Sequence, residues 1–122
     1  KQLLLEELKK KCEGNPPIFD FTLLGLGNDG HTASLFPNEN YNTDEFVIYS
    51  FGKGLNRLSF TPKVLSASTK IAFIVSGATK QIALKRLINN SESTDRTPAK
   101  LIKSKTKILV FTDLEASKDL DL

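Results

Sequence analysis

This 122-residue sequence contains no methionine and no tryptophan, and it has a single cysteine and a single histidine. A single cysteine, Cys12, excludes an intrachain disulfide framework and a cysteine-based metal site. With His31 as the sole histidine, a zinc ion would take its remaining ligands from carboxylates, so we expect no metal site.

The sequence also lacks an apolar run of membrane-spanning length, a charged-then-apolar leader, and a basic stripe interleaved with aromatic residues. The formal net charge is +3, and the one basic block is Lys9-Lys10-Lys11. We therefore expect neither a membrane nor a nucleic acid as partner. A reducing, soluble compartment, the cytoplasm, is the expected location, and the charge is compatible with an anionic substrate.

Apolar runs of strand length alternate with helical patterns along the chain. We expect helices over 1–12, 62–66, 78–88 and 115–120, a helical turn at 97–101, and strands over 18–24, 45–51, 57–61, 70–76 and 107–112. This alternation predicts an α/β layered fold, with a mostly parallel sheet flanked by helices, in a single unit over residues 1–122.

The chemistry concentrates between Phe19 and Pro37. An apolar strand over 18–24 leads into a turn with three glycines that carries Asp29 and His31, and a short helical run follows until Pro37 stops it. Ligands of open α/β sheets bind beyond the carboxyl ends of the strands, so both side chains are predicted at the rim of a small-molecule site. The imidazole suits proton transfer near neutral pH, and the carboxylate would orient it.

Other interpretations of the same stretch stay open. A lone histidine beside a turn is usually a surface or helix-capping residue, and Asp29 would in that case merely cap the short helix that follows. Gly25, Gly27 and Gly30 match the dinucleotide fingerprint G-x-G-x-x-G. That fingerprint needs a sustained helix and an acidic residue at the end of the next strand, so the stop at Pro37 and the polar loop over 38–45 disfavour a dinucleotide.

Two basic residues are candidates for holding an anion. Arg57 opens a strand after a glycine-rich turn, and a guanidinium suits bidentate contact with phosphate. Lys80 lies in the strand-to-helix turn over 76–80, where free amides and the helix dipole favour anions. The turn lacks the P-loop spacing, so ATP is not implied. Each residue alone is more typical of a solvent-exposed position than of an anion site.

The fifteen residues L-L-G-L-G-N-D-G-H-T-A-S-L-F-P at 23–37 resemble the signature of the 6-phosphogluconolactonases. The sister family of glucosamine-6-phosphate deaminases and isomerases shares the D-G-H core, but it continues with a segment that contains a ring-opening glutamate, where this chain has S-L-F-P. The resemblance continues in order through R-L-S-F-T at 57–61, G-A-T-K at 77–80, P-A at 98–99 and F-T-D at 111–113.

The resemblance implies a NagB-like, Rossmann-like fold and the hydrolysis of 6-phospho-D-glucono-1,5-lactone to 6-phosphogluconate in the oxidative pentose phosphate pathway. It implies no metal and no organic cofactor. His31 would be the general base and Asp29 its partner. The glycine turn, with Gly27 and Gly30, would contact the substrate and its developing oxyanion through main-chain amides. Arg57 and Lys80 would hold the substrate at its phosphate.

Two departures limit the resemblance. Family members usually carry a proline-rich segment before the arginine, whereas this chain has G-K-G-L-N at 52–56, so we expect a differently shaped loop there. The family also has an N-terminal half with a Gly-Gly-Ser or Gly-Gly-Thr phosphate loop and a further arginine, which nothing here matches.

Together with the lack of methionine, the second departure predicts that the chain is the C-terminal half of a longer protein, a partial domain whose partner is the missing N-terminal half. The open alternatives are a non-catalytic sugar-phosphate binding module, an aminosugar-phosphate isomerase or deaminase, and a lactonase domain fused to the preceding dehydrogenase of the pathway.

Overall fold

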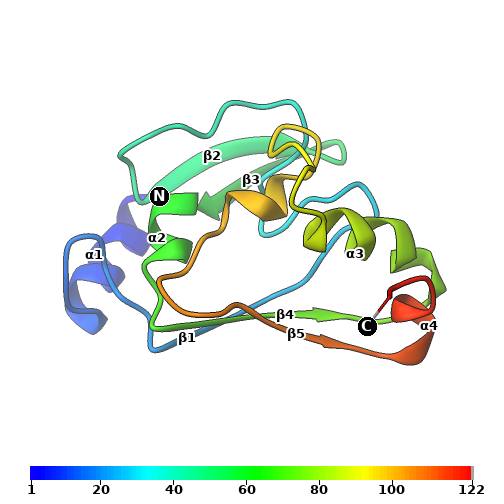
Figure 1. The fold of residues 1–122 in the computed structure, drawn as a ribbon. Coiled ribbons are helices and arrows are strands. Elements are labelled where there is room, and N and C mark those ends of the chain that lie inside the picture. Colours follow the sequence, from blue (N-terminus) through cyan, green and yellow to red (C-terminus); the bar gives the residue numbers. More distant parts are fainter. Residues whose placement is uncertain (122) are drawn as a thin grey trace.

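The computed structural model describes residues 1–121, which form a three-stranded parallel sheet, a separate two-stranded hairpin and several short helices (Figure 1). In chain order the elements are α1 (Gln2–Lys11), β1 (Phe21–Leu24), β2 (Val47–Gly52), β3 (Leu55–Phe60), α2 (Pro62–Ser66), β4 (Lys70–Val75), the 3-10 turn η1 (Ala78–Lys80), α3 (Gln81–Ile88), the 3-10 turn η2 (Pro98–Leu101), β5 (Leu109–Thr112) and α4 (Leu114–Ser117).

The parallel sheet has the order β1-β4-β5. The apolar strand β4 is central and pairs in parallel with both neighbours, with Leu24 opposite Phe73 and Val75 opposite Thr112. All three strands therefore end at the same edge, where ligands of open α/β sheets bind. The predicted α/β class with a mostly parallel sheet is confirmed.

The hairpin β2–β3 lies on the far side of the helices from the parallel sheet (Figure 1). Its turn is shorter than the sequence suggested, because Gly52 pairs with Leu55 and only Lys53 and Gly54 remain in the loop. Both have positive φ, 53° and 76°, which matches the tight turn that suits twisted strands. Arg57 consequently lies within β3 and does not open it.

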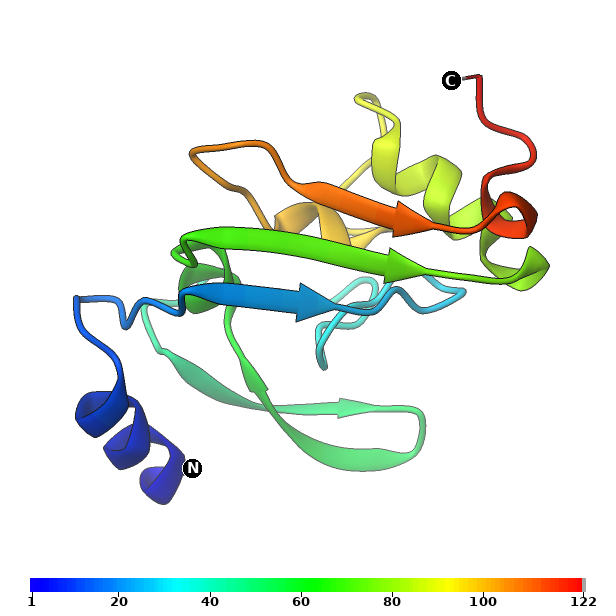
Figure 2. The same cartoon turned by 90° about the horizontal axis from the view of Figure 1, so that it is seen from below.

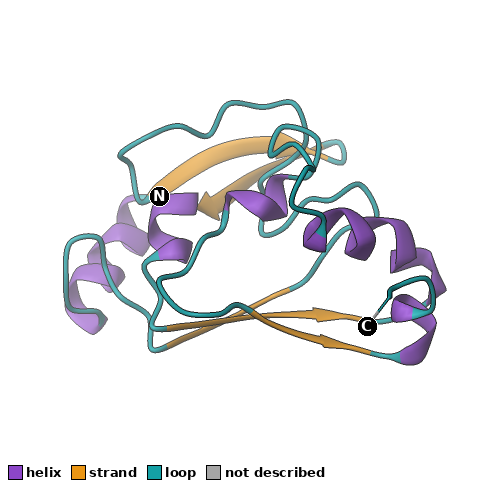
Figure 3. Cartoon of the chain, in the orientation of Figure 1, coloured by secondary structure: helices purple, strands orange, loops and turns teal. Residues whose placement is uncertain are grey.

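One face of the parallel sheet is covered by the core. Leu24, Phe73 and Val75 point into it, together with Leu35 of the long loop after β1 and Leu84 of α3, and all of these are buried. Figure 3 shows the long loops, in teal, that connect this layer to the hairpin. The core therefore fixes the loop after β1 against the sheet.

The other face of the sheet is bare over residues 1–121: seen from below, the three strands lie in front and no helix crosses them (Figure 2). Its exposed apolar side chains are Phe21, Leu23, Ile74, Leu109 and Phe111, each with about half of its surface accessible (47–54%). The predicted flanking helices are thus found on one face only, and the predicted burial of the first strand is only partly correct. Parallel sheets are ordinarily covered on both faces.

Candidate active site

The loop after β1 closes on itself through its own main chain. The Gly27 N–H donates to the His31 carbonyl (2.8 Å), and the Gly30 N–H donates to the Gly27 carbonyl (2.9 Å). Gly30 has φ +88°, a conformation that other L residues adopt only with strain. The Gly30 carbonyl in turn accepts from the Ala99 N–H of η2 (3.1 Å), which anchors the loop to the core.

The prediction of a short helix before Pro37 is wrong. Ala33 has φ +48°, which interrupts the helical dihedrals, and Thr32 and Leu35 form an isolated bridge instead. The buried Thr32 hydroxyl donates to the Gly25 carbonyl (2.7 Å) and holds this turn to the end of β1. Because no helix follows the third glycine, neither the dinucleotide interpretation nor helix capping by Asp29 applies.

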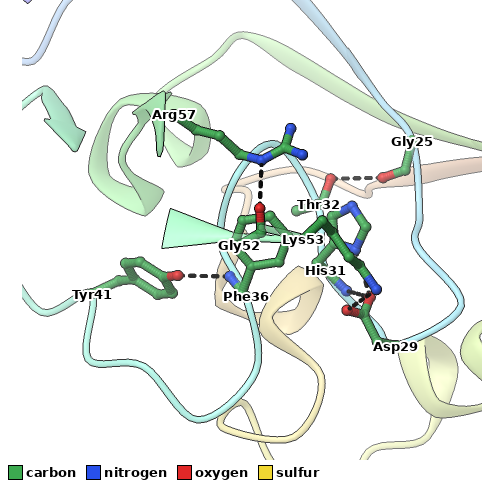
Figure 4. Close-up of polar contacts among 9 residues, drawn as sticks. All are labelled: Gly25, Asp29, His31, Thr32, Phe36, Tyr41, Gly52, Lys53 and Arg57. Atoms are coloured by element: carbon green, nitrogen blue, oxygen red, sulfur yellow. Dashed lines mark hydrogen bonds and ion pairs between the residues drawn. The ribbon is translucent and has the colours of Figure 1, made fainter. Parts of the chain in front are cut away.

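Asp29 and His31 form a hydrogen-bonded pair (Figure 4). Asp29 Oδ1 lies 2.5 Å from His31 Nδ1 and also accepts the His31 main-chain N–H at 3.1 Å. A proton on Nδ1, donated to the carboxylate, leaves the Nε2 lone pair free to accept a proton. Both side chains keep about a quarter to a third of their surface exposed, 26% and 31%.

The ionisation of Asp29 follows from these contacts. Partial burial raises the pKa of Asp29. Hydrogen bonds from the ring and the amide of His31, and from the Lys53 ammonium, together lower it by more, so that the pKa falls from 3.8 to about 2. The carboxylate is therefore charged at every pH at which the imidazole could act as a base. It contributes an electrostatic stabilisation to the protonated ring.

His31 and Lys80 line one common hollow of about 350 Å³ at the carboxyl edge of the sheet, together with Gly25, Gly27 and Thr32. This is within the size range of small-molecule sites. Two residues predicted from separate motifs are therefore brought to the same place. A larger hollow of about 690 Å³ lies beside the polar loop over 38–43, away from this pair, and we do not assign the chemistry to it.

Arg57 contacts Phe36, which in turn contacts His31. Its Nε donates to the Gly52 carbonyl (3.0 Å), and its guanidinium lies 5.6 Å from the centre of the Phe36 ring. Phe36 is stacked beside the imidazole of His31, with 4.9 Å between the ring centres. Arg57 does not line the hollow shared by His31 and Lys80.

The turn that carries Lys80 is fixed by Asp113, which follows β5. Both oxygens of the Asp113 carboxylate accept the Gly77 N–H (3.0 and 3.2 Å), and Oδ1 also caps α4 by accepting from Ala116 (2.8 Å). The Gly77 amide is thus already engaged. An anion at this turn would depend on the neighbouring amides and on the Lys80 ammonium.

Two side chains of the site were not anticipated from the sequence. Lys53, in the hairpin turn, places its Nζ 3.2 Å from Asp29 Oδ2, and Phe36 separates Arg57 from His31. Lys53 belongs to no motif of the family, and although Phe36 lies within the signature at 23–37, only the three-dimensional arrangement shows its contact with His31. The amides of Gly27 and Gly30 donate within the loop, and their contact with a substrate stays a prediction.

No three His, Cys, Asp or Glu side chains within residues 1–121 gather closely enough to hold a metal ion. Over the same residues, no helix has the length and apolar character needed to cross a membrane.

The chain is an α/β protein whose D-G-H loop lies at the carboxyl edge of its parallel sheet, the edge at which open α/β sheets bind their ligands. The family model described as glucosamine-6-phosphate isomerases/6-phosphogluconolactonase matches residues 2–111, and the chain belongs to that family. The resemblance noted in the sequence is confirmed.

Individual relatives agree. The chain is 36% identical over 109 residues to a 6-phosphogluconolactonase of Synechocystis, covering 88% of this chain and 45% of that one. The crystal structure of the devB protein superposes with a TM-score of 0.84 and 28% identity, over 98% of this chain and 53% of that one. A 6-phosphogluconolactonase of Thermotoga maritima gives 0.75 and 26%, over 91% and 49%. The chain therefore spans about half the length of these relatives.

Proposed function

We propose that the protein containing this chain hydrolyses 6-phospho-D-glucono-1,5-lactone to 6-phosphogluconate in the oxidative pentose phosphate pathway. The observation that carries the proposal is the Asp29–His31 pair, whose imidazole borders the hollow that Lys80 also lines. The relatives named 6-phosphogluconolactonase support the same substrate. A cytoplasmic location is part of the proposal.

In the proposed reaction His31 Nε2 takes a proton from a water molecule as its oxygen attacks C1 of the lactone. Asp29 holds the ring by Nδ1 and stabilises the imidazolium that forms. When the tetrahedral intermediate collapses, the bond between C1 and the ring oxygen breaks, and the imidazolium returns its proton to that oxygen. The reaction consumes one water and releases the open-chain acid.

Lys80 is proposed to hold the phosphate across the hollow, because it brings a positive charge to a turn whose amides favour anions. Arg57 would contribute with the terminal nitrogens of its guanidinium, since Nε is engaged with Gly52. The roles of Arg57, Gly27 and Gly30 are proposed from the family resemblance, because the two glycine amides donate within the loop and Arg57 does not line the hollow.

We further propose that the chain is the C-terminal half of the active domain, and that the N-terminal half of the same protein covers the bare face of the sheet. Exposed Phe21, Leu23, Ile74, Leu109 and Phe111 form a continuous apolar surface of a kind that parallel sheets normally bury. The relatives carry about as much additional sequence as they share with this chain.

When the chain is produced alone, we expect aggregation or self-association, and we expect co-production with the N-terminal half to give a stable one-to-one complex. Leu23→Ser with Phe111→Ser should keep the isolated chain in solution and abolish the complex, as measured by size-exclusion chromatography with light scattering. Ile82→Ser, at an exposed position of α3 on the opposite side, is the control. A complex unaffected by the double substitution would contradict the covering role of this face.

The proposed activity is tested by following lactone disappearance with the full-length protein and, separately, with residues 1–122. We expect enzyme-catalysed hydrolysis by the full-length protein only, because in this proposal the N-terminal half supplies part of the site. Reactions without enzyme correct for spontaneous hydrolysis. Ammonia release from glucosamine 6-phosphate would instead favour the other activity of the family, and binding of 6-phosphogluconate without turnover would favour a binding module.

A further inference from the structure

The turn between β2 and β3 contains an unusual residue. Lys53 is its first residue and has φ +53°, although a two-residue turn with positive φ at both positions favours asparagine or glycine there. A lysine in the left-handed region is strained. Strain of this kind tends to persist where the side chain has a task, so the contacts of Lys53 are informative.

The Lys53 ammonium reaches across to the loop after β1, where its Nζ lies 3.2 Å from Asp29 Oδ2 (Figure 4). The other oxygen of the same carboxylate holds the ring and the amide of His31. Asp29 is therefore held at both oxygens, from its own loop and from the hairpin. With only Oδ1 engaged, the carboxylate could rotate about its χ2 angle and release the imidazole.

The hairpin itself is held firmly against this loop, which distinguishes the contact from an ordinary surface ion pair. Gly52 lies flat on the ring of Phe36, so closely that a Cβ on it would come within 2.2 Å of the ring. The Ser50 hydroxyl donates to the Ser34 carbonyl (2.6 Å), and the Ser34 N–H donates to the Ser59 hydroxyl (3.1 Å). The base of Lys53 therefore has a fixed position relative to Asp29.

We propose that Lys53 is a positioning residue, whose ammonium fixes the Asp29 carboxylate in the orientation that holds the His31 imidazole for proton transfer. This inference rests on the proposed lactone hydrolysis. Lys53 lies outside the residues that line the hollow, so its effect passes through Asp29. The other cations that face the imidazole are Lys80 across the hollow and Arg57 behind Phe36.

Removal of the ammonium has one expected kinetic consequence. The imidazole is held less precisely, which lowers kcat on the order of tenfold while KM changes little. A purely structural role would lower kcat only together with the melting temperature.

Two variants of the full-length protein separate positioning from turn stability. Lys53→Met removes the charge, and Lys53→Asn removes it while suiting the turn, so that the melting temperature of Lys53→Asn should equal or exceed that of the wild type. Both should show the loss in kcat with little change in KM, and Lys53→Arg should keep most of the wild-type kcat. Lys63→Met is the matched control, because Lys63 also forms an ion pair, with Asp44 at 3.0 Å, away from the site.

Carboxyl-carbon NMR gives a readout that does not depend on turnover. The pKa of Asp29 should rise above about 2 in Lys53→Met, whereas in Lys63→Met it should remain at about 2. If the wild type is active and both Lys53 variants keep its kcat, the inference is overturned and the proposed function stands. If the wild type hydrolyses no lactone, the proposed function fails. The Asp29 titration then still decides whether Lys53 holds the carboxylate, and an unchanged value would overturn that contact.

Discussion

Replacement of His31 by asparagine in the full-length protein should lower kcat for the lactone on the order of a hundredfold to ten-thousandfold, the range that general-base catalysis contributes. Nε2 is the proton acceptor in the proposed reaction, and Nδ1 is bound to Asp29. An amide cannot take a proton from water at neutral pH. Stopped assays of lactone disappearance, corrected for the uncatalysed rate, measure the loss.

The fold should survive this substitution, because the His31 side chain is partly exposed and the loop is closed by main-chain hydrogen bonds that asparagine keeps. We therefore expect a melting temperature near that of the wild type and an unchanged affinity for 6-phosphogluconate, which Lys80 would hold. A variant that turns over within a few-fold of the wild type would remove His31 from the mechanism. Loss of product binding together with turnover would point to a structural defect.

The sequence was sufficient for those parts of the molecule that depend on local pattern. The apolar run over 70–76 predicts a central parallel strand. In the structure β4 is the central strand of the sheet, and four of its six residues are buried. The run over 107–112 also predicts a buried strand, yet every residue of β5 is exposed. Apolar composition indicates that a strand is meant to be buried, but it does not say which segment of the protein covers it.

The candidate site was predictable to a similar extent. The pairing of Asp29 with His31 follows from their spacing in one loop, and placing Lys80 beside His31 follows from the shared edge of a parallel sheet. The helix expected before Pro37 failed because Ala33 turns left-handed, which composition does not reveal. Lys53 and Phe36 are long-range neighbours whose roles depend on how the hairpin lies on the loop, and no local pattern encodes that.

Gly27→Ala should lower kcat/KM by on the order of a hundredfold, even though the backbone at Gly27 is not left-handed and accepts an L residue. The reason is that the Asp29 and His31 side chains occupy the space that a side chain on Gly27 would need. A Cβ on Gly27 would lie 2.0 Å from His31 Nδ1 and 2.7 Å from Asp29 Oδ1, where the two groups meet. The imidazole must move by about an ångström or more, and such a displacement of a catalytic group costs about two orders of magnitude in rate.

Gly25→Ala in the same loop separates the two effects, because a Cβ on Gly25 meets nothing within 4 Å and leaves the Asp29–His31 pair in place. Since Gly25 lines the hollow, we expect any loss in this variant to appear in KM, with kcat near the wild-type value. The Gly27 variant should still fold, since the displaced ring is partly exposed and can rotate outward. A crystal structure of the variant would locate the ring. Gly27→Ala with wild-type turnover would mean that the observed Asp29–His31 contact is not the arrangement that reacts, and the proposed mechanism would have to use a different orientation of the imidazole.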